Sequence, residues 1–173
     1  MNEVLQDELK KILNGRFSQS ESTRANYARG EDTYDPVLSE AVVFPETNEE
    51  VSKILKLCNE HKIPVVPFGT GTSLEGNVVG NENGITISLE KMNKVLSVNA
   101  EDFDCRVQAC VTKEQLNEYL REDGVFFPID PGANAAIGGM ASTSASGTMA
   151  VKYGTMKTVI SGLTVVLPNG DII

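Results

Sequence analysis

The sequence of 173 residues has few of the residues that several common kinds of site require. It contains a single histidine, His61, and three cysteines, Cys58, Cys105 and Cys110, with no CxxC spacing. A zinc site needs several nitrogen or sulfur ligands close together, so we predict no metal. A Ser-His-Asp triad would have to use His61, which has no obvious nucleophile beside it. The odd number of scattered cysteines fits a reducing compartment.

Basic residues and long apolar runs are also scarce. Acidic residues outnumber basic ones by 24 to 15, and the net charge is −9. Nucleic acids and anionic membranes both require clustered positive charge, so neither is an expected partner. No apolar run approaches the length of a membrane span, and the acidic N-terminus is unlike a signal peptide. We therefore predict a cytoplasmic protein with no transmembrane segment; peripheral attachment of a longer form to a membrane stays open.

Hydrophobic periodicity and helix-start signals predict the local structure. An amphipathic helix is expected over 2–13, and a polar, irregular segment that wraps around the rest over 14–38. Capping boxes of Thr47 with Glu50 and of Thr112 with Gln115 predict helices that reach about residues 61 and 124. The predicted strands are 41–44, 64–67, 85–89, 95–98, 103–111 and 159–167. The last strand is expected to form a hairpin with 171–173, and the alternation in 85–89 predicts a half-buried strand.

These elements suggest a division into an N-terminal helix and wrapping segment, residues 1–40, and a domain over 41–173. Because the chain stops as its last strand begins, we expect this domain to be incomplete.

Glycine is concentrated in two parts of the domain. Only Gly15 and Gly30 precede residue 69, whereas five glycines lie in 69–84 and six in 124–154. Glycine lets a backbone approach a ligand closely, and bare N–H groups with nearby hydroxyls suit an anionic or flat polar molecule. A single glycine is better explained by a turn, but two clusters favour two walls of one ligand site.

The first glycine-rich loop, residues 68–76, follows a predicted strand and Pro67. Gly69 and Gly71 begin a dinucleotide-binding pattern, but Leu74 stands where its third glycine should be. A Walker A loop is excluded, since no Gly-Lys-Ser/Thr occurs. Backbone N–H groups and neighbouring hydroxyls can hold a pyrophosphate without a lysine. The absence of a lysine fits a cofactor that is held rather than a phosphoryl group that is transferred.

The second glycine-rich loop, residues 130–154, is the longest stretch of small residues. Its Pro131-Gly132 pair predicts a turn, and Gly138 and Gly139 allow a flat ligand to approach the backbone. Lys152 is expected on the surface, and Tyr153 packs either on a ring system or on the core.

The two loops together resemble the FAD-binding domain of the vanillyl-alcohol oxidase type. Within that superfamily they are similar to the FAD-linked D-lactate dehydrogenase and glycolate oxidase group. The resemblance rests on PVVPFGTGTSLEG and FFPIDPGANAAIGGMASTSASGTMAVKYGTMK, with support from AVVFPETNEEVSKILKLCNEHKIPVVP and VVLPNGDII. It covers the chain from about residue 40 to the end. It implies an α+β fold of two subdomains with FAD between them, truncated before completion.

The resemblance also implies which residues bind the cofactor. The pyrophosphate loop would comprise Pro67, Phe68, Gly69, Thr70, Gly71, Thr72 and Ser73. The isoalloxazine and ribityl parts would contact Pro131, Gly132, Ile137, Gly138, Gly139, Ser142, Thr143, Ser144, Gly147, Tyr153 and Gly154. Covalent-flavin relatives carry a histidine where this chain has Gly71, so FAD is expected to be noncovalent.

The implied function is the oxidation of a D-2-hydroxy acid by hydride transfer to FAD. Met140, Ser144 and Ser146 replace the Asn, Asn and first Gly of the glycolate-oxidase pattern IGGN-x-ATNAGG, which favours D-lactate as the substrate. This small molecule would bind to an absent C-terminal domain. The catalytic residues and the electron acceptor are therefore unknown, and the chain alone is expected to be inactive.

Three alternatives stay open: a glycolate oxidase subunit, a flavoenzyme that reduces an enolpyruvyl sugar nucleotide with NADPH, and a non-catalytic nucleotide-binding module.

Overall fold

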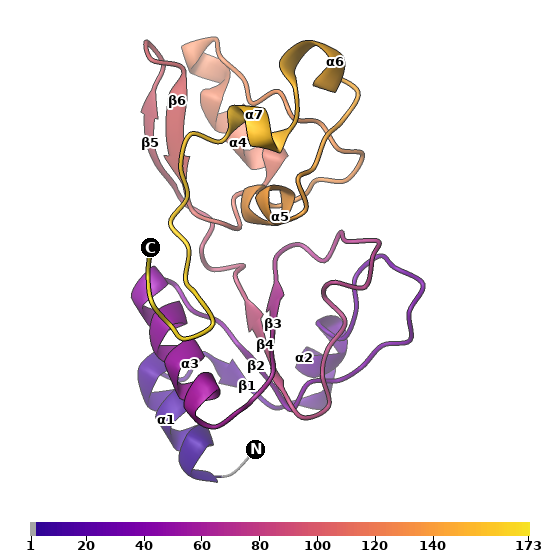
Figure 1. Ribbon diagram of the computed structural model, residues 1–173, viewed down its shortest axis with the longest axis vertical. Helices are drawn as coiled ribbons and strands as arrows, with labels where there is room; N and C mark the ends of the chain where they lie inside the picture. Colours follow the sequence, from indigo (N-terminus) through magenta and orange to yellow (C-terminus); the bar gives the residue numbers. More distant parts are fainter. Residues whose placement is uncertain (1–2) are drawn as a thin grey trace. The chain divides into compact units, whose positions relative to one another are not determined.

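The computed structural model describes residues 3–173, which divide into two compact units (Figure 1). Unit 1 comprises the residues up to Lys91 together with Thr164–Ile173, and unit 2 comprises Met92–Leu163. Both units contain helices and strands, which confirms the α+β prediction.

Unit 1 is built on a four-stranded sheet with the order β1-β2-β4-β3. The strands are β1 (Phe17–Ser18), β2 (Ala41–Val43), β3 (Val65–Phe68) and β4 (Ile85–Ser88). The last three are parallel, and β1 pairs with β2 in the antiparallel direction. The predictions for 41–44, 64–67 and 85–89 are thus confirmed to within one residue at each end. Because parallel strands end at the same edge of a sheet, loop 68–76 begins where β4 also ends.

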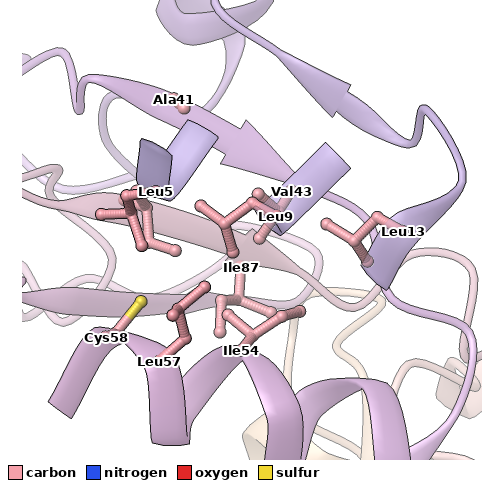
Figure 2. Packing of buried hydrophobic residues seen from close by; sticks show 10 residues of the cluster. Leu5, Leu9, Leu13, Ala41, Val43, Ile54, Leu57, Cys58 and Ile87 are labelled. Carbon is pink, nitrogen blue, oxygen red and sulfur yellow. The ribbon is translucent and has the colours of Figure 1, made fainter. Parts of the chain in front are cut away.

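Helices α1 (Glu3–Leu13) and α3 (Asn48–Glu60) pack on one face of this sheet (Figure 2). Alternate residues of the strands point to this face, because side chains in a strand have a period of two. The buried members are Leu5, Leu9, Leu13, Ala41, Val43, Ile54, Leu57, Cys58, Ile85 and Ile87. The helix predicted over 2–13 is confirmed from Glu3 onward; residue 2 lies outside the described residues.

Strand β4 is buried on both faces, so the prediction of a half-buried strand is wrong. Thr86 and Ser88 are both 0% exposed. The hydroxyl of Thr86 forms a hydrogen bond of 2.8 Å with that of Ser39, which is also buried. Alternating polarity failed to indicate exposure here, because the polar partner of Thr86 is another buried side chain rather than water.

The segment 14–38, which we predicted to be irregular, contains β1 and a helix, α2 (Glu21–Asn26). The hydroxyl of Ser20 starts α2 by accepting a hydrogen bond from the N–H of Thr23. From α2, Arg24 donates a hydrogen bond to the carbonyl of Ser39, beside the buried Thr86. The segment is thus held beside the sheet by the pairing of β1 with β2 and by the side chain of Arg24.

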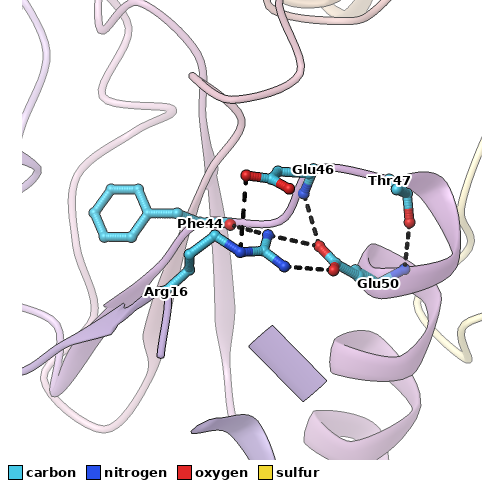
Figure 3. A network of polar contacts seen from close by, with 5 residues as sticks. All are labelled: Arg16, Phe44, Glu46, Thr47 and Glu50. Carbon is cyan, nitrogen blue, oxygen red and sulfur yellow. Dashed lines mark hydrogen bonds and ion pairs between the residues drawn. The ribbon is translucent and has the colours of Figure 1, made fainter. Parts of the chain in front are cut away.

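Arg16 connects β1 to the end of β2 and to the first turn of α3 (Figure 3). It donates to the carbonyl of Phe44 at 2.8 Å and to both carboxylate oxygens of Glu50, at 2.8 and 2.5 Å. Thr47 caps α3 as predicted, by accepting from the N–H of Glu50. The Glu50 side chain accepts from the N–H of Glu46 rather than completing a reciprocal capping box. The local sequence thus correctly predicted the start of α3. The carboxylate of Glu50, however, accepts from Arg16 and from the N–H of Glu46 instead of from the N–H of Thr47.

Unit 2 combines an antiparallel hairpin with helices. The hairpin consists of β5 (Val95–Asn99) and β6 (Asp104–Val107), so the extended run predicted over 103–111 is too long. Thr112 caps α4 (Lys113–Leu120) as predicted, and a 3-10 turn (Arg121–Asp123) extends this helix to a left-handed Gly124. The short helices are α5 (Ile137–Ser142), α6 (Ala150–Tyr153) and α7 (Met156–Val159).

Loop 130–154, to which no secondary structure was assigned from the sequence, contains the short helices α5 and α6. One prediction for the C-terminal part is wrong. The strand over 159–167 is largely missing, because Val159 ends α7 and, with Ile160, packs on the buried Met156. The predicted hairpin is confirmed: Val165 and Ile173 exchange two backbone hydrogen bonds around the turn at 168–170. This hairpin contacts α3 in unit 1, where Ser52 donates to the carbonyl of Gly170.

Candidate functional site

Loop 68–76 leaves the carboxyl end of β3 with a row of free donors. Among the described residues, the amides of 69–74 donate no hydrogen bond to another protein atom. Main-chain donors need a partner, which for a surface loop is water or a ligand. Successive amides in a turn can form an anion-binding site, and this loop supplies donors of the kind that a phosphate group requires.

The side chains of this loop divide into exposed and buried groups. The hydroxyls of Thr70 and Thr72 lie 3.4 Å apart, and Ser73 donates to the side chain of Asn77 at 2.8 Å. Phe68, in contrast, is only 6% exposed, and its ring packs edge-on against Tyr27 with centroids 5.0 Å apart. The Phe68 ring therefore supports the loop from inside the protein.

Gly71 is required by the protein itself. Its φ of +74° is a conformation that other residues rarely adopt, and a Cβ there would lie 2.7 Å from Cζ of Phe68. A larger residue at 71 would thus disturb the loop whether or not a ligand is bound.

Sequence reasoning missed a second segment that contacts this loop, residues 28–37. The N–H of Glu31 donates to the carbonyl of Gly71 at 3.0 Å, and the ring of Tyr34 packs against Gly76. One signal was available: Gly30 is a lone glycine in a polar stretch, and such a glycine often marks a close approach of two backbones.

Asp130 shapes the second loop. Its carboxylate accepts from the hydroxyl of Thr148 at 2.6 Å and from the N–H of Met149 at 3.0 Å. The bond from Thr148, followed by that from Met149, holds the pKa of Asp130 below its ordinary value. A Cβ at Gly147 would collide with Asp130, so this predicted cofactor residue is a glycine for a reason within the chain.

The glycines of α5 have different surroundings. Gly138 donates to the carbonyl of Ala109 at 2.8 Å, and a Cβ at this position would lie 2.8 Å from that of Ala109. Gly139 is exposed, and nothing lies within 4 Å of where its Cβ would be. Gly132 is equally open. Gly132 and Gly139 are therefore the glycines of this loop whose backbone a flat ligand can approach.

The remaining predicted residues of loop 130–154 are mostly at the surface. Ser142 and Thr143 donate their hydroxyls to the carbonyls of Gly138 and Gly139, which leaves their oxygen lone pairs available. Ser144 is exposed in a left-handed conformation, with φ of +52°. Tyr153 is half-buried and packs edge-on against Phe126, with centroids 5.5 Å apart.

Three further predicted residues complete the set. Pro131 and Ile137 are half-buried, and Ile137 donates to the carbonyl of Val111 at 2.8 Å. Gly154 has φ of +83° and lies against the side chain of Thr158. The predicted residues thus form two groups, 67–73 in unit 1 and 131–154 in unit 2.

Residues 39–173 match the protein family described as "FAD binding domain". The chain belongs to this family of FAD-binding domains. The prediction of FAD as the cofactor is therefore confirmed, whereas the individual binding residues stay predictions. Within the part of the chain that the structure describes, no group of three or more His, Cys, Asp or Glu residues could hold a metal ion. None of the helices over 3–173 has the length and apolar character to cross a bilayer.

The chain is similar to several curated proteins. It is 46% identical over 156 residues to the "Probable D-lactate dehydrogenase, mitochondrial" of Danio rerio, a match that covers 90% of this chain and 31% of that protein. It is 43% identical over 168 residues to the mitochondrial D-lactate dehydrogenase (cytochrome) of Arabidopsis thaliana, covering 96% and 30%. The glycolate oxidase subunit GlcD of Bacillus subtilis is 33% identical over 159 residues, covering 91% and 34%. The chain spans about a third of the length of these relatives.

Solved structures confirm the fold. An alkyldihydroxyacetonephosphate synthase has a TM-score of 0.91 at 23% identity, covering 98% of this chain and 35% of that one. A variant of the BBE-like 1 protein of Physcomitrella patens has a TM-score of 0.82 at 22% identity, covering 95% and 37%. At this identity the likeness concerns the fold alone, which is the one expected from the resemblance to the vanillyl-alcohol oxidase type.

Proposed function

We propose that the chain is the FAD-binding part of an oxidoreductase that oxidises a D-2-hydroxy acid, with D-lactate as the preferred substrate. The D-lactate dehydrogenases of Danio rerio and Arabidopsis thaliana are 46% and 43% identical to it. The GlcD subunit is less similar, at 33%. This order favours D-lactate over glycolate.

The six unpaired amides of 69–74 are the observation that carries FAD binding. A diphosphate needs several donors, and amides fixed in a loop supply them without a lysine. The exposed Thr70 and the half-buried Thr72 add hydroxyl donors beside these amides. We assign the pyrophosphate of FAD to this loop, with Phe68 and Pro67 as its support.

The isoalloxazine and ribityl parts are assigned to loop 130–154. The open backbone at Gly132 and Gly139 suits a flat ring, because no side chain separates the ring from the peptide groups. Ser142, Thr143 and Ser144 are exposed residues, and their hydroxyl groups suit the polar ribityl chain. Gly138, Gly147 and Gly154 act indirectly, since their contacts are with the protein.

FAD, when bound, supplies the hydride acceptor for the reaction. The residues of this chain bind and orient the cofactor, and the proposed set contains no basic residue. Removal of the hydroxyl proton and binding of the substrate carboxylate need a base and a cation. We therefore assign no catalytic residue to the chain, and we expect no D-lactate turnover by these 173 residues alone.

The assignment of the pyrophosphate can be tested by titration with FAD, followed by flavin fluorescence. Thr72→Asp places a negative charge beside the diphosphate and should weaken binding by at least about tenfold. Asn83→Asp adds the same charge to an exposed loop of the same unit and should bind like the unchanged protein. Equal affinity of the two variants would contradict the assignment. Gly71 is a poor site for this test, because any side chain there meets Phe68.

The substrate can be tested on the complete protein by D-lactate-dependent reduction of a dye. We expect kcat/KM to be higher for D-lactate than for glycolate. Preference for glycolate would favour the glycolate oxidase subunit, to which GlcD is similar. Retention of FAD without any 2-hydroxy-acid oxidation would favour the flavoenzyme that uses NADPH. Absence of FAD binding would leave the non-catalytic nucleotide-binding module.

We also propose that FAD is noncovalent and that the protein is cytoplasmic, in solution or peripheral to a membrane. Gly71 offers no side chain for attachment in loop 68–76, and His61 lies at the end of α3. The location is tested by cell fractionation; recovery of the native protein in an organelle would contradict it.

A further inference from the structure

Residues 28–37, named here the cover segment, form a closed loop against the proposed pyrophosphate loop. The N–H of Val37 donates to the carbonyl of Ala28 at 3.2 Å and closes the segment. The same carbonyl accepts from the N–H of Gly80 at 3.0 Å, and Ala28 is only 1% exposed. The cover segment is thus anchored to unit 1 at its base.

The segment and the loop meet backbone to backbone at Gly30. A Cβ there would lie 2.7 Å from the carbonyl oxygen of Gly71 and 2.8 Å from that of Ser73. The φ of Gly30 lies outside the left-handed range, so its conformation does not demand glycine. Glycine is needed because the backbones of the cover segment and the loop are too close for any side chain.

This contact decides which way the loop amides point. The N–H of Glu31 holds the carbonyl of Gly71 at 3.0 Å, and the carbonyl of Ser73 also faces Gly30. In a trans peptide the C=O and the following N–H point in opposite directions. The N–H groups of Thr72 and Leu74 therefore point away from the cover segment, and both belong to the unpaired row.

Asp32 keeps the cover segment in shape. Its carboxylate accepts from the N–H of Gly30 at 3.1 Å and from the N–H of Tyr34 at 3.0 Å, and the residue is only 7% exposed. The ring of Tyr34 in turn packs against Gly76, at the far end of the loop. The segment therefore contacts the loop at 71–73 and at 76.

We infer that the cover segment, through Gly30, Glu31 and Asp32, positions the amides of Thr72 and Leu74 for the diphosphate of FAD. These are positioning residues, since they act through the backbone of loop 68–76. The inference rests on the proposed function, because it presumes that a diphosphate binds to this loop.

The test compares three ligands, FAD, ADP and riboflavin, in the protein with Gly30→Ala and with Asp32→Asn. ADP carries a diphosphate and riboflavin carries none, so loss of amide positioning weakens ADP and FAD but leaves riboflavin binding unchanged. Gly30→Ala should raise the dissociation constants of ADP and FAD by about tenfold, as expected when a well-oriented hydrogen bond to a charged group is lost. In Asp32→Asn an amide NH₂ replaces one acceptor and faces a backbone donor, so binding should weaken in the same way.

Gly162→Ala is the matched control, because Gly162 is exposed and nothing lies within 4 Å of its Cβ position. Asp32→Asn keeps the side-chain shape and serves where Gly30→Ala fails to fold. Unchanged ADP and FAD affinity in folded variants would overturn the inference, as would equal weakening of riboflavin and ADP. If the unsubstituted protein binds neither FAD nor ADP, the proposed function fails instead.

Discussion

Asp130 is a residue outside the predicted cofactor set that nevertheless holds loop 130–154 in shape. Its two hydrogen bonds join the start of the loop to Thr148 and Met149, across Gly147. A carboxylate accepts both bonds fully only when it is ionised. The lowered pKa of Asp130 therefore means that the ionised form favours the folded loop.

The lowered pKa of Asp130 predicts that loop 130–154 is more stable at neutral pH than in acid. A carboxyl group whose pKa is lowered by folding contributes stability above its unfolded pKa and loses it as the pH falls through the folded value. The loop should therefore loosen from about pH 4 downward. Asp130→Asn should lower the protection of the Met149 amide, measured against its intrinsic exchange rate, several-fold at neutral pH, and should abolish the loss of protection expected below pH 4.

Asp123→Asn, in the exposed 3-10 turn of the same unit, is the control and should exchange like the unchanged protein. Protection of the Met149 amide as high in the Asp130 variant as in the unchanged protein, at neutral pH, would show that the backbone holds the loop without this carboxylate.

The glycines show what a sequence reveals at the residue scale and what it conceals. Their clustering correctly indicated a cofactor domain, because glycine lets the backbone approach a ligand closely. It did not separate Gly138, which lies against Ala109, from Gly139, whose surroundings are open. That distinction depends on a contact between residues about 30 positions apart, which no local pattern contains.

At the scale of elements, the network of Arg16 and Glu50 joins β1, β2 and α3 (Figure 3). The side chains of Arg16 and Glu50 are 21% and 19% exposed, so solvent screens their interaction only in part. The hydrogen bonds from Arg16, aided by the N–H of Glu46, hold the pKa of Glu50 below its ordinary value. Bidentate hydrogen bonding, as between Arg16 and Glu50, is the strongest form of an arginine–carboxylate pair.

Glu50→Gln should lower the free energy of unfolding at pH 7 by about 1–2 kcal/mol, after allowance for partial exposure. Because the folded pKa is the lower one, the contribution is present above about pH 4.3 and disappears as the pH falls further. Urea denaturation at pH 7 and pH 3 measures both effects. Glu49→Gln, an exposed neighbour in the same turn of α3, controls for the helix dipole. A Glu50 variant no less stable than the Glu49 variant would show that the pairing contributes nothing.

Helices with a capping residue at their own start could be predicted from the sequence. Elements that are held by contacts with residues far away in the chain could not. Thr47 and Thr112 cap their helices within three residues, so α3 and α4 could be predicted from local sequence.

Helix α5 contains two glycines, which disfavour a helix, and it is held by the contact of Gly138 with Ala109. Val159 has high strand propensity, but packing on Met156 places it in α7. The lone Gly30 indicates a close approach in the cover segment, but its partner Gly71 lies 41 residues later and could not be identified from local sequence.

At the scale of the whole molecule, the fold class and FAD could be predicted because both loops are short, contiguous motifs. The family match over 39–173 includes both loops. Substrate recognition could not be assigned to residues in this way, because the chain spans about a third of its relatives. The effect of bound FAD on the stability of the fold, in contrast, can be measured on this chain.

A noncovalent cofactor stabilises the folded state by mass action, so unfolding should depend on the concentration of free FAD. Stabilisation of about 2.7 kcal/mol is expected at 100 times the dissociation constant and about 4.1 kcal/mol at 1,000 times. Thermal unfolding at several FAD concentrations measures this rise, and acid precipitation should leave the flavin in the supernatant. A covalently attached flavin predicts the opposite pair of results, namely a midpoint independent of added FAD and a yellow pellet.

The variant Thr72→Asp tests whether this stabilisation depends on loop 68–76. Because the variant should bind FAD more weakly, it should need a higher FAD concentration for the same rise in midpoint. Its stability without FAD should equal that of the unchanged protein.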